Sequence, residues 1–86
     1  MKSLTNLKDQ DEAPIDPVII QLAEEHLKTL TVQPHAIYGA CGEVVFEWQL
    51  PNEVIERRFI GLDGIEKMIT FPNSPAIFSN VLSRNV

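Results

Sequence analysis

The stretch that decides the fold runs from Val44 to Phe71 and reads VVFEWQLPNEVIERRFIGLDGIEKMITF. Apolar and polar residues alternate through three short runs, which is the period of strands that bury one face. Pro51-Asn52-Glu53 separates the first run from the second, and Leu62-Asp63-Gly64-Ile65 separates the second from the third. We therefore expect a three-stranded antiparallel meander over these residues.

The register of the first hairpin is predicted from the pairing that gives the more favourable cross-strand contacts. A turn through Pro51 to Val54 places aromatic residues together and opposite charges together, with the pairs Leu50–Ile55, Phe46–Phe59, Trp48–Arg57 and Glu47–Arg58. A shift by one residue would place Phe46 opposite Arg58 and Trp48 opposite Glu56, which moves one strand's apolar residues to the other face. We expect the first of these two registers.

The second hairpin is predicted from Asp63-Gly64, because glycine accepts a positive φ and aspartate tolerates it. Leu62 should then pair with Ile65, and Phe59 with Met68. The first face of this sheet is apolar and consists of Phe46, Trp48, Leu50, Ile55, Phe59 and Met68. The second face mixes apolar residues with charged ones: Val45, Ile60, Ile69 and Phe71 with Glu47, Glu56, Arg58 and Lys67.

An amphipathic helix precedes the meander and is expected to cover its first face. Asp16 followed by Pro17 is a strong helix start, and Ile15 and Ile20 have the spacing of a hydrophobic staple. The apolar residues that follow recur every three or four positions: Ile19, Leu22, Ala23, His26, Leu27 and Leu30. Pro34 ends the pattern, so we expect a helix from Asp16 to about Leu30.

Two further segments bear on the size of the sheet and on what covers its second face. Ala36-Ile37-Tyr38 is a candidate fourth strand, followed by the turn Gly39-Ala40-Cys41-Gly42. Ser74-Pro75 resembles a helix cap, and Ile77, Phe78, Val81 and Leu82 fit one side of a short C-terminal helix. Either this helix or another molecule would cover the second face. The expected organisation is a flexible arm over residues 1–13 and a single small α+β domain over residues 14–86, with a helix packed on three or four antiparallel strands.

Composition narrows the function classes. The 86 residues are 44 % hydrophobic and 22 % charged, with 7 basic against 12 acidic side chains and a net charge of -5. This balance disfavours nucleic-acid binding through Arg57, Arg58 and Lys67. No apolar run approaches the roughly 20 residues of a membrane span, and one cysteine permits no disulfide within the chain. We expect a cytoplasmic protein that has no membrane or nucleic-acid partner.

Motifs for catalysis or cofactor binding are weak. Cys41, His26 and His35 lack the spacing of a thiol nucleophile with its base, and the chain has no paired ligands typical of zinc sites. Glu47 and Glu56 on an open sheet are more typical of ion pairs with arginine than of an acid and base pair. We therefore predict no catalytic residue, no metal site and no cofactor.

The combination of an amphipathic helix, Phe46-Glu47-Trp48 and the Asp63-Gly64 hairpin resembles small uncharacterised bacterial proteins with an N-terminal helix packed on a three-stranded β-meander. The resemblance covers roughly residues 16–71. It implies a fold and brings no activity or site residues to carry over.

The leading hypothesis is a small acidic protein-interaction module: a homodimer, an inhibitor or antitoxin-like partner, or an accessory subunit. Its predicted interface is the second sheet face, with the residues Val45, Glu47, Arg58, Ile60, Lys67, Ile69 and Phe71. On this hypothesis Ile60→Asp should abolish association and leave the fold intact. The alternative hypothesis is a small-molecule-binding or thiol-dependent enzyme site formed by Cys41, His35 and Tyr38.

Overall fold

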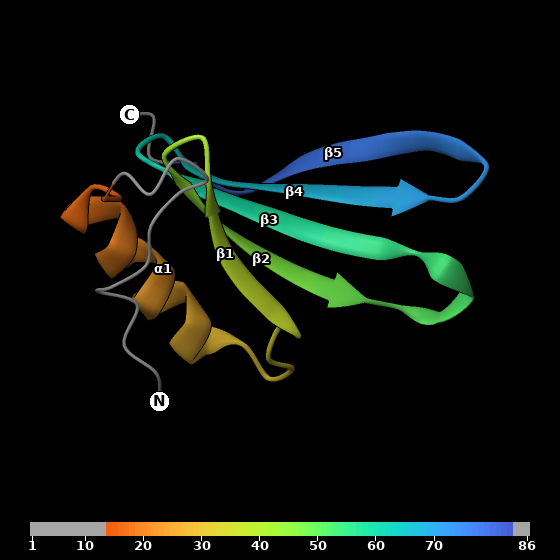
Figure 1. The fold of residues 1–86 in the computed structure, drawn as a ribbon, viewed down its shortest axis with the longest axis horizontal. Helices are drawn as coiled ribbons and strands as arrows, with labels where there is room; N and C mark the ends of the chain where they lie inside the picture. Colours follow the sequence, from red (N-terminus) through yellow and green to blue (C-terminus); the bar gives the residue numbers. More distant parts are fainter. Residues whose placement is uncertain (1–13, 84–86) are drawn as a thin grey trace.

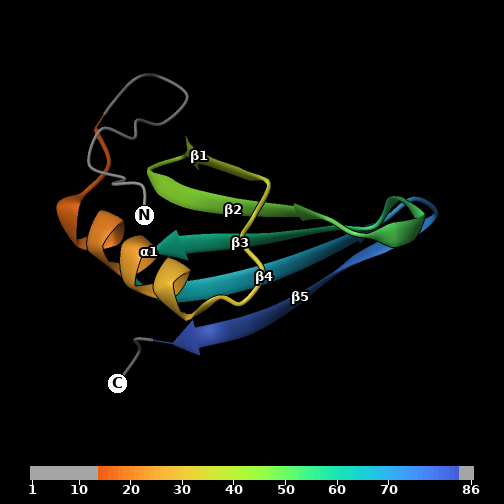
Figure 2. The ribbon, with the colours of Figure 1, turned by 90° about the horizontal axis from the view of Figure 1, so that it is seen from below.

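The computed structural model describes residues 14–83 as one helix followed by a five-stranded antiparallel sheet (Figures 1 and 2). The elements are α1 (Pro17–Thr29), β1 (Ala36–Ala40), β2 (Glu43–Gln49), a 3₁₀ turn (Pro51–Glu53), β3 (Ile55–Gly61), β4 (Gly64–Phe71) and β5 (Ser74–Ser83). Strand order in the sheet follows the chain, β1-β2-β3-β4-β5. The predicted α+β class is confirmed, but the sheet has five strands where three or four were expected.

The helix forms where the capping signals place it. The Val18 N–H donates to Oδ1 of Asp16 at 2.8 Å, and Pro17 occupies the first helical position, where no hydrogen of its own is needed. Ile15 and Ile20 are both buried, as the staple requires. At the other end Leu30 is the C-cap and is extended. The predicted helix is therefore confirmed to within one residue at each end.

The expected C-terminal helix is wrong, because Ser74–Ser83 forms β5 and pairs with β4 along its length. A two-residue turn at Pro72-Asn73 reverses the chain, with Phe71 opposite Ser74. Without β5, the outer backbone groups of β4 would be left unpaired beside a half-apolar sheet. Pairing with β4 satisfies those groups, and this tertiary gain outweighs a helical spacing of four apolar residues.

The register of the first hairpin is also different from the prediction. Phe46 pairs with Arg58 and Trp48 with Glu56, which is the alternative that the cross-strand argument rejected. The connection is one residue longer than expected, and the Leu50 N–H donates to the Val54 carbonyl at 2.8 Å across it. Asn52 and Glu53 both have positive φ in this connection, 64° and 62°.

The reason for this register lies in the helix. It aligns Val44 and Phe46 of β2 with Ile60 of β3 on the side where α1 packs, so one continuous apolar layer faces the helix. The sequence argument compared only the two strands with each other. Burial against α1 is worth roughly 1.5 to 3 kcal/mol for each large side chain, more than the roughly 0.2 to 1 kcal/mol of a cross-strand pair.

The second hairpin turns at Leu62-Asp63, with Gly61 opposite Gly64 and Ile60 opposite Ile65. This register differs by two residues from the expected Leu62–Ile65 pairing. A shift of two keeps β3 and β4 in the same relation, so Phe59 and Met68 still share one side of the sheet. The one-residue difference in the first hairpin moves both of them to the side opposite α1, so the prediction that they lie with Phe46 and Trp48 on the helix-covered face is wrong. Gly64 has a φ of 128°, which a residue with a Cβ rarely adopts.

The core lies between α1 and one face of the sheet. It is formed by Ile15, Ile19, Ile20, Ala23, Leu27, Val44, Phe46, Trp48, Ile60 and Ile65. The Trp48 ring meets Phe46 edge-on at 6.2 Å between centroids, and its Nε1–H donates to the Val32 carbonyl at 3.0 Å. This bond fixes the α1–β1 linker to the sheet. Within residues 14–83, no helix has the length and apolar character needed to cross a membrane.

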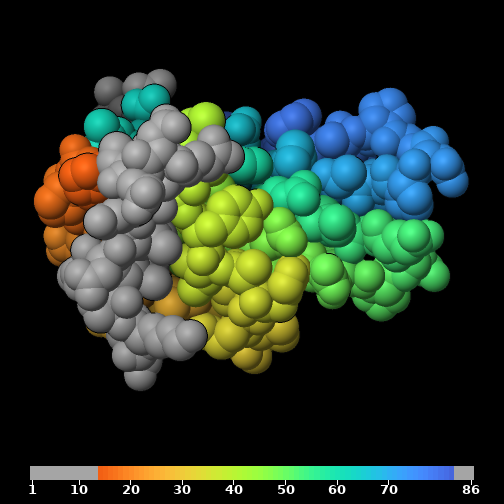
Figure 3. All heavy atoms as spheres, viewed as in Figure 1, coloured from red at the N-terminus to blue at the C-terminus, as the bar shows by residue number. Residues whose placement is uncertain are grey.

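The helix covers only one end of the sheet. Figures 1 and 2 show α1 across the ends of the strands, with the β2–β3 and β4–β5 hairpins extending beyond it. In the space-filling view the same two hairpins, in green and blue, project from the body of the molecule (Figure 3). The hairpin end of β5 therefore lies outside the layer that α1 covers (Figures 1 and 2).

Candidate functional site

The seven residues of the predicted interface are divided between the two faces of the sheet. Arg58 and Ile60 lie on the helix-facing side, and the ladder partners of that side place Lys67, Ile69 and Phe71 there too. Val45 and Glu47 point to the opposite side. Val45 and Ile60 are also fully buried within this chain. The structure therefore brings Lys67, Ile69 and Phe71 together but does not join them with Val45 and Glu47 in one surface.

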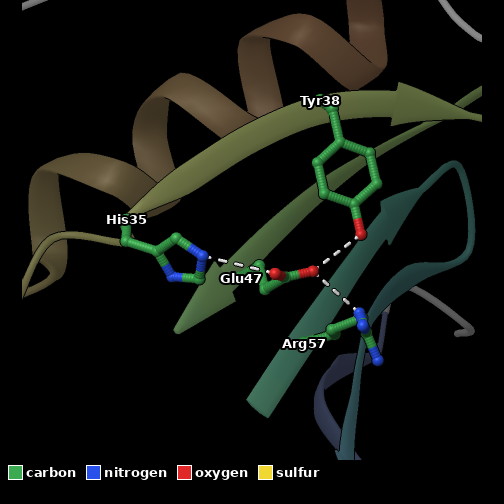
Figure 4. Close-up of polar contacts among 4 residues, drawn as sticks. All are labelled: His35, Tyr38, Glu47 and Arg57. Atoms are coloured by element: carbon green, nitrogen blue, oxygen red, sulfur yellow. Dashed lines mark hydrogen bonds and ion pairs between the residues drawn. The ribbon is translucent and has the colours of Figure 1, made fainter. Parts of the chain in front are cut away.

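Glu47 is the centre of a polar cluster on the face opposite the helix (Figure 4). Its Oε1 accepts from the Tyr38 hydroxyl at 3.0 Å and from Nε of Arg57 at 2.9 Å. Its Oε2 lies 3.3 Å from Nε2 of His35, whose backbone N–H also donates to the Glu47 carbonyl at 2.9 Å. Strands β1, β2 and β3 supply Tyr38, Glu47 and Arg57 in turn, so the cluster ties three strands together.

The electrostatics of this cluster keep Glu47 ionised. Partial burial alone would raise the pKa of the Glu47 carboxyl, but hydrogen bonds from Arg57 and Tyr38, with the charges of Arg57 and His35, hold that pKa below its usual range. Burial alone would lower the pKa of Arg57, and its contacts with Glu47 and Tyr38 raise it instead. A carboxylate held ionised in this way binds and orients its neighbours and does not exchange protons near neutral pH.

A second cluster lies on the helix-facing side around Arg58. Its Nε donates to Oε2 of Glu56 at 2.9 Å, and its Nη1 lies 2.9 Å from Nε2 of His26 on α1. The guanidinium carbon lies 5.0 Å from the centroid of the Trp48 ring, a cation–π contact. Arg58 therefore joins the last turn of α1 to the sheet.

His26 belongs to this cluster and stacks on the Phe46 ring at 6.1 Å between centroids. Burial first, and the Arg58 charge second, lower the pKa of the His26 imidazole. Donation from Arg58 requires the Nε2 of His26 to be unprotonated. The neutral form of His26 is thus the one that fits the folded chain.

The roles of the two arginines are exchanged relative to the sequence prediction. Arg57 was expected over Trp48 and Arg58 opposite Glu47, whereas Arg58 lies over Trp48 and Arg57 pairs with Glu47. This exchange follows directly from the one-residue difference in register. Both types of interaction were predicted, and each was assigned to the neighbouring residue.

The thiol site of the alternative hypothesis is not assembled. Cys41 is exposed in the two-residue turn after β1, with a φ of 53°, and His35 precedes the other end of that strand. The five residues of β1 lie between them, and six steps along an extended chain correspond to roughly 20 Å. Tyr38 and His35 meet at Glu47 instead. Among residues 14–83, no group of three or more histidine, cysteine or acidic side chains is placed to hold a metal ion.

An acidic hollow lies at the β3–β4 turn. Its lining includes Glu43, Asp63 and Glu66, and burial, followed by the charges of Glu66 and Asp63, raises the pKa of the Glu43 carboxyl. A Cβ on Gly61 would lie 2.6 Å from Oε2 of Glu43, so the flexible end of the Glu43 side chain would have to move aside. The concentration of negative charge disfavours an anionic ligand at this end of the sheet.

The surface that sequence reasoning missed is β5. Its four large apolar side chains are 39 % to 58 % exposed: Ile77, Phe78, Val81 and Leu82. Ile77 pairs with Ile69 on the helix-facing side, and Phe78 pairs with Met68 on the other, so apolar groups are exposed on both faces. No residue from Ser74 to Ser83 carries a charge. These four apolar residues were noted in the sequence, but their spacing fits a helix as well as a strand.

The two edge strands of the sheet differ in length and in how many large hydrophobic side chains they expose. The edge strand β1 has five residues, and none of them is an exposed large hydrophobic residue. The edge strand β5 has ten residues and four exposed large hydrophobic residues. Proteins commonly protect sheet edges with short strands, charges or prolines, and β5 has only Pro75 near its start.

Comparison of this chain with protein-family models, with curated protein sequences and with solved structures found no match in any of the three. The exposed side chains and the free edge of β5 are therefore the basis for assigning a function.

Proposed function

We propose that this chain is a protein-binding module without catalytic activity of its own, and that it binds through the β4–β5 side of its sheet. The observation that carries this proposal is β5: a sheet edge ten residues long, uncharged, with large apolar side chains exposed on both faces. In this proposal the contact residues Ile77, Phe78 and Leu82 replace Val45 and Ile60, which are buried within the chain. Lys67, Ile69 and Phe71 remain part of the proposed surface.

Two physical terms favour binding at this edge. Unpaired N–H and C=O groups along a free strand offer hydrogen bonds to an extended backbone, which is the basis of β-strand addition. Apolar side chains on both faces add a hydrophobic contribution of roughly 25 cal/mol for each Å² removed from water. Interface cores are depleted of charge and surrounded by polar residues, and Glu66 and Lys67 on the neighbouring strand supply such a rim.

The charged clusters support binding over catalysis. The ionised Glu47 is occupied by three partners, and Arg58 is held by Glu56 and His26. Both arrangements stabilise the sheet that presents β5. A thiol-dependent site has no comparable support because Cys41 and His35 lie at opposite ends of β1.

The proposal is tested by affinity capture with matched variants. Wild-type protein, Ile77→Lys and Val32→Lys are immobilised and exposed to an extract of the source cells. Val32 is the matched control because its side chain is 68 % exposed and lies in the α1–β1 linker, away from β5. Proteins bound by the wild type and by Val32→Lys should be lost with Ile77→Lys, while circular dichroism shows all three folded. Retention of the same proteins by Ile77→Lys would overturn the proposal.

A further inference from the structure

We infer that the partner at β5 is a second copy of this chain, and that the two β5 strands pair antiparallel across a two-fold axis at Phe78. This inference rests on the proposed function and names its partner. The resulting dimer would have a continuous ten-stranded sheet with a helix over each outer part of the same face. Four features of β5 lead to it: its free edge, its interrupted pairing with β4, its apolar pattern and its lack of charge.

The free edge provides the backbone contact. One side of β5 pairs with β4, and no described helix or strand lies along its other side. Its central N–H and C=O groups on that side therefore have no partner in another described strand. A second strand would exchange hydrogen bonds with them, which removes the edge that β5 leaves open.

The interruptions in the β4–β5 ladder limit where a second strand can pair. Val81 is an extra residue between the pairs Ile65–Leu82 and Glu66–Asn80. Toward the other end, Pro75 and Ala76 of β5 lie opposite the single residue Thr70. Such bulges disturb the regular spacing of backbone groups and end pairing. The uninterrupted part of β5 is therefore Ile77 to Asn80.

Symmetry then narrows the register. A two-fold axis normal to the sheet pairs residues that point to the same face, so the axis passes through one residue of the segment. An axis at Phe78 places Phe78 against its own copy on one face and brings the two Ile77 side chains into diagonal contact on the other. Only an axis at Phe78 or at Ser79 keeps three residue pairs within Ile77 to Asn80, and an axis at Ser79 would place Phe78 against the polar Asn80. The first arrangement buries apolar side chains on both faces and is the one that we infer.

Charge favours a second copy over a charged partner. Each chain has a net charge of -5, so two copies repel unless the contact excludes acidic groups. Ser74 to Ser83 contains none, and the charged residues of β4 nearest the segment are Glu66 and Lys67, which have opposite signs. A strand that is uncharged and apolar on both faces is complementary to itself and offers no group that selects a basic or acidic peptide.

Cysteine cross-linking tests the register, in a Cys41→Ser background that leaves the introduced cysteine as the only thiol. Phe78→Cys should give a disulfide-linked dimer under mild oxidation, because residues paired across the axis have Cα atoms about 4.5 to 5.5 Å apart, within disulfide reach. Asn80→Cys is the matched control on the same face. Its two copies would lie four residues apart along the strands, roughly 13 Å, and should not cross-link.

Light scattering on the unmodified protein provides an independent measurement, because Phe78→Cys also removes part of the contact. The wild type should show twice the 9.7 kDa mass of one chain over a tenfold concentration range, and Ile77→Lys should show the single mass. A wild type of single mass at every concentration, or equal cross-linking of Asn80→Cys and Phe78→Cys, would overturn this inference. The proposed function would still stand if Ile77→Lys abolished capture of a different protein, so the two failures are distinguishable.

Discussion

Shortening the Ile60 side chain tests whether the helix-facing side of β3 is the core. Ile60 has no exposed surface and packs with α1, β2 and Ile65. Removing one buried methyl group in Ile60→Val should lower the free energy of unfolding by about 0.5 to 1.5 kcal/mol, and Ile60→Ala by about 2 to 5 kcal/mol. Ile77→Ala is the matched control: Ile77 is 56 % exposed in the single chain, so its truncation should change the stability of the monomer by about 0.5 kcal/mol or less.

Urea unfolding followed by Trp48 fluorescence provides the measurement. The urea m-value for a chain of this size is about 1 kcal/mol/M, so Ile60→Val should move the midpoint down by about 0.5 to 1.5 M. All variants are compared at one low protein concentration, because association of folded chains would add to the apparent stability. Ile60→Ala is expected to leave a small fraction folded, and Ile60→Val keeps the test measurable in that case.

A midpoint for Ile60→Val equal to that of the wild type would refute the observed register. It would restore the arrangement in which Ile60 lies on an uncovered face, where Ile60→Asp removes association and leaves the fold intact. In the structure that substitution places a carboxylate in the fully buried core without a partner, so Ile60→Asp should fail to fold. Circular dichroism of Ile60→Asp separates the two expectations.

Three further predictions concern pH, the Glu47 cluster and the β1–β2 turn. The pKa of the His26 imidazole is lowered in the folded chain by burial and by the Arg58 charge, so the unfolded chain binds the proton more readily. The contribution of neutral His26 to the free energy of unfolding should therefore be fully present above its usual pKa of about 6.5 and be lost as the pH decreases below it. The urea midpoint of His26→Gln should depend less steeply on pH between about 7.5 and about 5.5. Glu47→Gln removes the counter-charge of Arg57 and should lower stability by about 1 kcal/mol in the same assay, since the Glu47 side chain is only 16 % exposed; an unchanged midpoint would contradict a stabilising role for the cluster. Gly42→Ala should lower the free energy of unfolding by about 1 kcal/mol through backbone strain alone, because φ is 77° and no atom lies within 4 Å of the added Cβ. Thermal unfolding measures this change, and an unchanged stability would show that the turn relaxes.

The accuracy of the sequence predictions depended on how far apart the interacting residues lie in the chain. The start of α1 was predicted correctly because Asp16, Pro17 and the staple act within one helical turn. Cross-strand ion pairing of Glu47 and an arginine over Trp48 were also predicted. The specific arginine was wrong in both, because Arg57 and Arg58 point to opposite faces and only the register assigns each to its face.

The candidate site shows the same division. Single-sequence patterns identified Glu47, Lys67, Ile69 and Phe71 as residues of interest, but could not show that Val45 and Ile60 are buried. The exposed surface of β5 was hidden by a spacing of apolar residues that also fits a helix. Its conformation depends on the unpaired edge of β4, which no pattern within Ser74 to Ser83 records.

The sequence by itself determined the capped helix, the alternating strands, a hairpin turn that includes Asp63, and an uncharged C-terminal segment, because these depend on local backbone preferences and on composition. Only the tertiary structure decided the β2–β3 register, the face of each arginine and the strand conformation of β5. The physical reason is that burial beneath α1 and pairing along β4 join segments distant in the chain, and each contributes more free energy than the local preference it overrides.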